Sequence, residues 1–193
     1  MKRICVYCGS SSGTRPSYIQ AARALGTSLA RRGLGLVYGG SNVGLMGALA
    51  DTVLAQGGEV IGVIPESVVI REVAHTRLAD LRIVGSMHER KALMAELADG
   101  FIAMPGGFGT LEEFCEIVTW VQLGLHRKPC GLLNVEGYYD GLLSFLNHAV
   151  AEGFIRTEYR SVVLTDSEVD GLLEKISKYE APHLKKWIDR DET

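Results

Sequence analysis

The chain has 193 residues, of which 47% are hydrophobic and 22% charged, and its formal net charge is −3. These values are typical of a packed globular protein and exclude extended disorder. Because the sequence has no block of Lys and Arg, we expect no nucleic-acid partner. Because its apolar runs are only as long as strands and its N-terminus lacks a signal-peptide core, we expect a cytoplasmic protein without a membrane partner.

Short apolar runs alternate with helical patterns along the whole chain. The expected strands are 3–7, 34–38, 59–64, 81–84, 101–104, 130–134 and 161–164. The expected helices are 16–31, 43–56, 86–98, 110–123, 138–152 and 167–178. The strands are apolar on both faces, which indicates a parallel sheet covered by helices on two sides.

This alternation predicts an α/β fold, a doubly wound and mostly parallel Rossmann-like sheet in a single domain. We expect the domain to span residues 1–180, with a polar C-terminal tail over 181–193. Ligands of such folds bind at the carboxyl ends of the strands. The loops that follow the strands are therefore where chemistry is expected.

Four cysteines are present, and Cys5 and Cys8 form a C-x-x-C pair. A redox pair of this kind normally opens a helix, and a zinc site needs a second pair of ligands. Here Gly-Ser-Ser-Ser-Gly follows the pair, and Cys115 and Cys130 are too far apart to complete a site. We therefore expect two small buried residues at the end of the first strand, and no metal.

Glycine is unusually frequent: 23 of the 193 residues are glycine, about 12% against a usual share of roughly 7%. Loops at 9–14, 39–47 and 105–110 are rich in it, and each joins an expected strand to an expected helix. A helix N-terminus presents free N–H groups, and glycine lets an anion approach the backbone. One such loop is equally consistent with a tight turn, but three at one sheet edge favour a phosphate-bearing ligand.

The first two loops narrow the identity of that ligand. The first lacks the Lys of a P-loop, and neither spells the G-x-G-x-x-G dinucleotide fingerprint. We therefore expect a mononucleotide or sugar phosphate rather than a nucleoside triphosphate or NAD, and no cofactor. The residues expected to support the phosphate from these loops are Gly9, Ser10, Gly40, Ser41 and Gly44.

The third loop continues into acidic residues, with the sequence PGGFGTLEE over 105–113. Thr110 and Glu113 have the spacing of a capping box, and the structural interpretation is that Glu113 caps the helix. The functional interpretation is that a carboxylate beside a phosphate site binds ribose hydroxyls or activates water. Both can hold, since Glu112 and Glu113 point to different sides of the helix.

A second cluster, SMHERK over 86–91, opens the helix at 86–98. Arg90 and Lys91 are cations near a helix start, where the macrodipole disfavours them. A solvated polar turn is one explanation, and a bound anion that offsets the placement is the other. His88 is more often a surface residue than a catalytic one in such a position.

In their order and spacing, the segments 39–47, 86–91 and 105–113 resemble the LOG ("Lonely guy") family of cytokinin riboside 5′-monophosphate phosphoribohydrolases. The resemblance covers roughly residues 2–178. It implies a Rossmann-like fold that hydrolyses the N-glycosidic bond of N6-substituted adenosine 5′-monophosphates, and often AMP, to the free base and ribose 5-phosphate. It also implies a homodimer with the site near the subunit interface. Members are often labelled lysine decarboxylases, but no Lys here lies in a context suited to a pyridoxal Schiff base.

The resemblance also assigns roles to individual residues. Catalytic roles fall on Arg90, Glu113 and Glu112. These residues and several others are expected to contact the substrate, the others being Glu72, Met87, Lys91, Gly106, Gly107, Phe108, Gly109, Thr110, Leu111 and Thr119. We expect the base to lie among apolar side chains such as Met87 and, from this or a partner chain, Trp120.

One alternative comes from another functional class: a non-catalytic carrier of a nucleotide or cofactor on the same fold. The paired carboxylates beside the phosphate loop argue against it, because a carrier has no need of them. An NAD oxidoreductase is disfavoured because the dinucleotide fingerprint is absent.

Overall fold

The computed structural model describes residues 1–69 and 74–182 and contains one seven-stranded parallel sheet in the order β4-β3-β2-β1-β5-β6-β7. The strands are β1 (Arg3–Tyr7), β2 (Gly35–Tyr38), β3 (Val60–Pro65), β4 (Asp80–Val84), β5 (Gly100–Ala103), β6 (Cys130–Leu133) and β7 (Val163–Asp166). The predicted doubly wound α/β sheet is confirmed. The expected tail at 181–193 lies, apart from its first two residues, outside the described residues.

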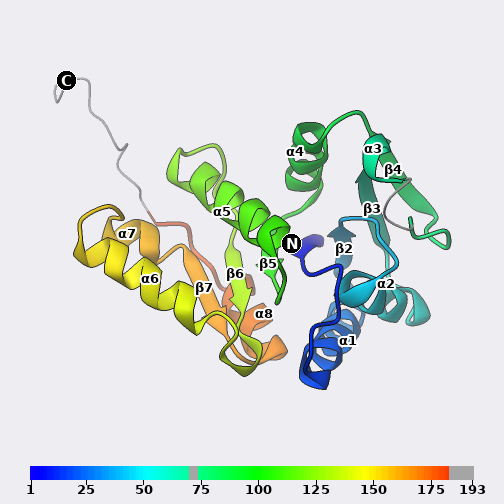
Figure 1. Cartoon of the computed structure of the whole chain (residues 1–193), viewed down its shortest axis with the longest axis horizontal. Coiled ribbons are helices and arrows are strands. Elements are labelled where there is room, and N and C mark those ends of the chain that lie inside the picture. The colour runs from blue at the N-terminus through cyan, green and yellow to red at the C-terminus, as the bar shows by residue number, and fades with distance from the viewer. Residues whose placement is uncertain (70–73, 183–193) are drawn as a thin grey trace.

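Helices connect the strands and cover both faces of the sheet (Figure 1). They are α1 (Pro16–Arg31), α2 (Gly44–Ala55), α3 (Glu66–Val69), α4 (Met87–Leu97), α5 (Phe108–Gln122), α6 (Asp140–Ala151), α7 (Thr157–Arg160) and α8 (Val169–Ser177). Every helix and strand expected from the sequence is present, with ends within two residues of the prediction. The four-residue helices α3 and α7 were not predicted, because a single turn carries no periodic pattern.

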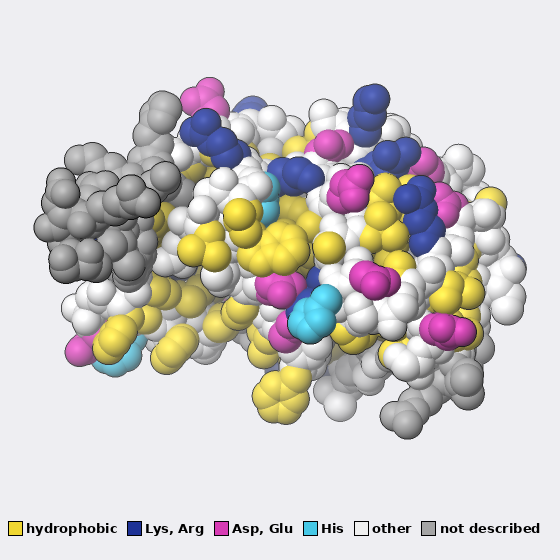
Figure 2. All heavy atoms as spheres, turned by 90° about the horizontal axis from the view of Figure 1, so that it is seen from above, with side chains coloured by type: hydrophobic (Ala, Val, Ile, Leu, Met, Phe, Trp, Pro, Cys, Tyr) yellow, Lys and Arg dark blue, Asp and Glu magenta, His cyan; other side chains and the backbone are white. Residues whose placement is uncertain are grey.

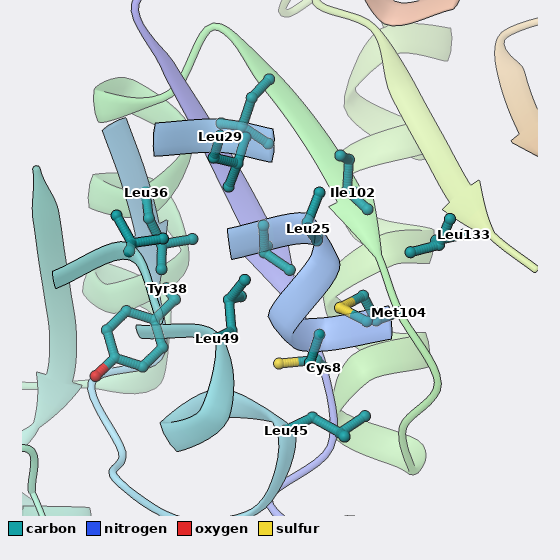
Figure 3. Packing of buried hydrophobic residues seen from close by; sticks show 14 of the residues in the cluster. Cys8, Leu25, Leu29, Leu36, Tyr38, Leu45, Leu49, Ile102, Met104 and Leu133 are labelled. Atoms are coloured by element: carbon teal, nitrogen blue, oxygen red, sulfur yellow. The ribbon is translucent and has the colours of Figure 1, made fainter. Parts of the chain in front are cut away.

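The core consists of two apolar layers separated by the sheet. Ile4, Val6 and Cys8 of the first strand and its exit pack toward α1, α2 and α8, whereas Cys5 and Tyr7 pack toward α4 and α5. Figure 3 shows Cys8 among the leucines of the first layer. Since Cys5 and Cys8 lie on opposite faces, they are buried free thiols, as the sequence predicts.

The connections bring the three glycine loops together at one edge of the sheet. Strands β2, β3 and β4 extend from β1 in one direction, and the chain then returns to place β5 on the other side of β1. This reversal is the topological switch point, where doubly wound folds bind ligands. There the Gly9 N–H donates to the Pro105 carbonyl (3.0 Å), and the Leu45 N–H donates to the Gly9 carbonyl (3.1 Å).

The second loop can approach the first this closely because of one glycine. Gly44 adopts a positive φ of +60°, and a Cβ there would collide with the Ser10 backbone. Any other residue would be strained in conformation and would also push the two loops apart.

Charges are mixed over the surface. On the face seen in Figure 2, Lys and Arg side chains lie among Asp and Glu side chains and form no patch of one sign. Within the two described ranges, no helix is both long and apolar enough to cross a membrane.

The packing of α1 on α2 supplies a stability test. A Cβ on Gly26 would lie 2.9 Å from both the Leu49 carbonyl oxygen and the Thr52 Cβ, whereas a Cβ on Gly141 in α6 would meet nothing within 4 Å. We expect Gly26→Ala to lower the free energy of unfolding by about 1–3 kcal/mol through overpacking. We expect the control Gly141→Ala to raise it by about 0.5–1 kcal/mol. Urea unfolding measures both, and a stabilising Gly26→Ala would contradict the close helix contact.

Candidate active site

A pocket of about 380 Å³ opens at the switch point, over the carboxyl ends of β1 and β3 and the start of α5. Its described lining residues are Val6, Tyr7, Cys8, Gly9, Ser10, Gly39, Met46, Ile64, Pro65, Val68, Met87, Arg90, Gly107, Phe108, Gly109, Thr110 and Glu113. Among them Arg90 and Glu113 alone have a basic or acidic side chain of the Arg, Lys, Asp or Glu type.

Helix α5 begins at the pocket with backbone groups rather than with a side-chain cap. Gly107 is the N-cap in an extended conformation, and as a glycine it has no side chain to cap the first turn. The N–H groups of the first turn of a helix have no intrahelical acceptor. Phe108, Gly109 and Thr110 in this first turn all line the pocket, and the macrodipole adds positive potential there. This end of the pocket is suited to an anion.

The capping-box interpretation of Glu113 is therefore wrong. Thr110 is a buried residue inside the first turn rather than the N-cap. A Cβ on Gly106 would overlap the Thr110 hydroxyl, so the Gly-Gly pair lets the helix start earlier than the sequence pattern indicates. As a result, Glu112 and Glu113 lie in the second turn, where no orphan N–H group needs them.

Glu113 is instead held by Arg90 from the neighbouring helix α4. The Arg90 Nη1 donates to Glu113 Oε1 at 2.8 Å, and the Arg90 Nε donates to the Val63 carbonyl at 3.1 Å. The side chains of Arg90 and Glu113 are only 12% and 9% exposed. A Cβ on Gly39 would overlap the guanidinium, so the second glycine loop leaves the room that Arg90 occupies. The result is a rigid, charge-assisted pair in the pocket wall.

The other ionisable groups of the pocket floor stay neutral. Burial first, and the Glu113 carboxylate second, raise the pKa of Cys8 well above its usual value. Burial likewise raises the pKa of Tyr7. A thiol held in this protonated form is not a nucleophile, so the chemistry of this pocket falls to the carboxylate and the guanidinium.

A second ion-pair group lies beside the pocket but not in its lining. The ammonium of Lys91, 9% exposed, donates to Glu112 and, at 3.0 Å, to Glu116. Burial alone would lower the pKa of Lys91, but the hydrogen bonds to both glutamates outweigh it and raise that pKa. The solvated-turn explanation is thus wrong for both cations of α4, because carboxylates of α5 offset their unfavourable position.

Ser86 caps α4 as the sequence predicts. Its hydroxyl accepts from the Glu89 N–H at 3.1 Å, and Glu89 in turn accepts from the Gly85 N–H at 2.8 Å. This reciprocal cap fixes the first turn of α4, and with it the position of Arg90 one residue later. His88 is exposed and does not line the pocket.

The structure brings together about half of the residues singled out in the sequence. Those that line the pocket are Gly9, Ser10, Met87, Arg90, Gly107, Phe108, Gly109, Thr110 and Glu113. Gly106 lines an adjoining hollow of about 310 Å³ that shares three of these residues. Glu72 lies outside the described residues.

The remaining candidates lie outside the lining of the pocket. They are Gly40, Ser41, Gly44, Lys91, Leu111, Glu112 and Thr119. Gly40 and Ser41 shape the second loop, where the Gly40 carbonyl accepts from the His75 N–H at 2.9 Å. Trp120 packs against the core of its own chain rather than in its pocket.

Sequence reasoning missed the apolar floor of the pocket. The missed residues are Val6, Tyr7, Cys8, Gly39, Met46, Ile64, Pro65 and Val68. Most of them end a strand or follow one directly, and that position at the carboxyl edge was the available signal. Val68 gave no signal, because it lies on the unpredicted helix α3. Over the described ranges, no three His, Cys, Asp or Glu side chains are grouped to hold a metal ion.

Fold and pocket together define a Rossmann-like α/β protein with an open helix N-terminus and an ion-paired carboxylate in a pocket at its switch point. Solved structures share the fold, including a molybdenum cofactor binding protein from Rippkaea orientalis (TM-score 0.69, 24% identity, 92% of this chain and 96% of that one). The molybdenum cofactor carrier protein from Chlamydomonas reinhardtii is similar to it too (TM-score 0.70, 20% identity, the same coverage).

Sequence comparison narrows the class. The profile of the family described as "Possible lysine decarboxylase" matches residues 46–176. Cytokinin riboside 5′-monophosphate phosphoribohydrolase LOG7 from Arabidopsis thaliana is 51% identical over 93% of this chain and 82% of its own length. The enzyme LOG from Oryza sativa is 52% identical over 92% of this chain and 74% of its own length. The chain belongs to the LOG family of phosphoribohydrolases.

The two ion-pair groups differ in burial, which predicts different costs of breaking them. Arg90→Met takes the guanidinium from a carboxylate that is 9% exposed, and we expect it to lower the free energy of unfolding by about 3–5 kcal/mol. Lys91→Met faces carboxylates that are 53% and 29% exposed, and we expect a loss of at most about 1 kcal/mol. Chemical denaturation compares the two, and equal losses would contradict the burial difference.

Proposed function

We propose that this protein hydrolyses the N-glycosidic bond of adenosine 5′-monophosphates, N6-substituted ones included, to the free base and ribose 5-phosphate. The observation that carries the proposal is the position of the Glu113 carboxylate. It is fixed by Arg90 at 2.8 Å and lines the same pocket as the open N-terminus of α5. The family to which the chain belongs, with relatives about 50% identical over most of its length, gives independent support.

The phosphate end of the substrate has a matching site. Backbone N–H groups of Gly107–Thr110 and the Thr110 hydroxyl provide donors without a basic side chain, and the helix macrodipole adds positive potential. Ser10 and Gly9 of the first loop line the same pocket. This seat fixes one end of the nucleotide and so sets where the sugar lies.

The reaction breaks the C1′–N9 bond, and its electron pair leaves with the base. Positive charge then grows on the ribose ring, as in other glycoside cleavage. Glu113, paired with Arg90, stabilises this charge, binds ribose hydroxyls and takes a proton from the attacking water as the water oxygen bonds to C1′. The base takes up a proton on nitrogen from solvent water as it departs past the apolar side chains of Met87, Met46 and Ile64, and Glu113 then returns its own proton to solvent.

Two other activities fit the pocket less well. A pyridoxal-dependent decarboxylase needs a lysine in its site, but no lysine lines the described part of the pocket, and Lys91 is held by two glutamates beside it. A carrier would not require a buried carboxylate fixed by an arginine. The carrier structures share the fold at 20–24% identity, and fold alone does not carry function.

Neighbouring glutamates provide a matched test of the mechanism. We expect Glu113→Gln to lower kcat for AMP and isopentenyladenosine monophosphate by about 10²–10⁴-fold, the usual effect of one positioned acid or base. We expect Glu112→Gln to have a far smaller effect, because its carboxylate binds Lys91 outside the pocket. Chromatography of the released base measures both. Comparable losses in the two variants would contradict the assignment of Glu113.

We further propose that the protein acts as a cytoplasmic homodimer. Support comes from the resemblance to its family and from exposed apolar side chains at the end of α5, where Leu123 and Leu125 are 64% and 67% exposed. Light scattering should give a mass near twice the chain's 21.0 kDa, and the double variant Leu123→Glu/Leu125→Glu should shift it toward one chain. A monomeric wild-type protein would contradict the proposal.

A further inference from the structure

Two adjacent tyrosines after β6 donate hydrogen bonds to backbone carbonyls at the start of the third glycine loop (105–110). The Tyr138 hydroxyl donates to the Gly106 carbonyl at 2.6 Å, and the Tyr139 hydroxyl donates to the Met104 carbonyl at 2.5 Å. Between these two, the Pro105 carbonyl accepts from the Gly9 N–H at 3.0 Å. Three consecutive carbonyls of the loop thus each have a donor from another part of the chain.

The turn that carries the tyrosines is itself well fixed. The Asn134 side chain accepts from the Tyr139 N–H at 2.7 Å and donates to Asp140 at 2.8 Å. Glu136 and Gly137 both have positive φ, which closes the turn tightly. The Tyr138 ring packs edge-on against Tyr139, so its hydroxyl has little freedom.

Peptide geometry links the Tyr138 hydrogen bond to the pocket. In a planar trans peptide the C=O and the following N–H point in opposite directions, and the described chain has no cis peptide. Tyr138 and Gly106 line the adjoining hollow and not the main pocket, whereas Gly107 lines both. Because the Tyr138 hydroxyl holds the Gly106 carbonyl from the side of the hollow, the Gly107 N–H points away from that hydroxyl, at a residue that also lines the main pocket.

The Gly106–Gly107 peptide would be free to rotate without a hydrogen bond such as that from Tyr138. It joins two glycines, and without Cβ atoms both flanking residues populate many backbone conformations. If the peptide rotated, a carbonyl dipole would face the anion in place of an N–H donor. The Tyr138 hydroxyl bonds the carbonyl only in the orientation that presents the donor.

We propose that Tyr138 is a positioning residue that sets the anion affinity of this pocket by fixing the orientation of the Gly106–Gly107 peptide. The inference rests on the proposed function, because it names the phosphate end of the substrate as the anion. Tyr138 itself is 43% exposed, touches the loop through its hydroxyl and adds little to the core, so its bond serves the loop rather than the stability of the fold.

Tyr139 supplies a matched control. Its hydroxyl makes an equivalent bond to the Met104 carbonyl, but the next residue is Pro105, which has no N–H to orient. The Tyr139 side chain is 1% exposed, so loss of its hydroxyl leaves a buried carbonyl without that donor. Tyr139→Phe should lower the melting temperature and leave anion binding as it was.

The experiment compares binding of ribose 5-phosphate and of adenine, by calorimetric titration, to the wild-type protein, Tyr138→Phe and Tyr139→Phe. We expect Tyr138→Phe to raise the Kd for ribose 5-phosphate about three- to tenfold, the range of one net hydrogen bond, with the Kd for adenine and the melting temperature nearly unchanged. For Tyr139→Phe we expect a lower melting temperature and both Kd values unchanged.

Wild-type hydrolysis of AMP and isopentenyladenosine monophosphate, measured in parallel, separates the two ways of failing. If the wild-type protein releases base from either nucleotide but Tyr138→Phe binds ribose 5-phosphate as tightly as it does, the role of Tyr138 is overturned and the proposed function stands. The role of Tyr138 is also overturned if Tyr138→Phe loses as much affinity for adenine as for ribose 5-phosphate. If the wild-type protein releases base from neither nucleotide, the proposed function is overturned, and the inference with it.

Discussion

The ion pair between Arg90 and Glu113 is the interaction on which the rest of the site depends. It joins α4 to α5 in the pocket wall and pairs a guanidinium with a carboxylate whose side chain is only 9% exposed. Each surrounding feature serves it: Ser86 fixes the start of α4, the Val63 carbonyl orients the guanidinium, and Gly39 leaves it room. A buried pair of this kind adds little to stability by itself, so its presence in a pocket points to chemistry.

Backbone geometry supplies the other half of the site. The switch point places the exits of β1 and β5 side by side, and glycine at the contacts lets three loops meet with almost no side chains between them. In the proposed function, amide donors bind the anion without a lysine or arginine, so that the one arginine of the described pocket lining pairs with the carboxylate. The Arg90–Glu113 pair and the open start of α5 thus occupy different parts of one pocket. Cleavage of a phosphorylated nucleoside needs this separation, because the phosphate and the glycosidic bond lie at different ends of the ribose.

Local patterns were enough to predict the sheet, its helices and the three loops, because apolar strands, caps and glycine-rich exits act over a few residues. Pocket residues could be predicted where they belong to such a local pattern, as Gly107 does in a glycine-rich loop and Arg90 does at a helix start. Two results needed tertiary structure. The start of α5 at Phe108 depends on Gly106 accommodating the Thr110 hydroxyl. The separate partners of Glu112 and Glu113 depend on how α4 packs against α5, which no spacing within either helix encodes.

We infer that the amide-lined helix start and the Glu113 carboxylate act on one substrate. A crystal structure of Glu113→Gln with bound AMP tests it most directly. We expect phosphate oxygens within hydrogen-bond distance of the N–H groups at 107–110 and the side chain at position 113 next to the ribose. A phosphate bound elsewhere, with that side chain turned away from the sugar, would contradict it.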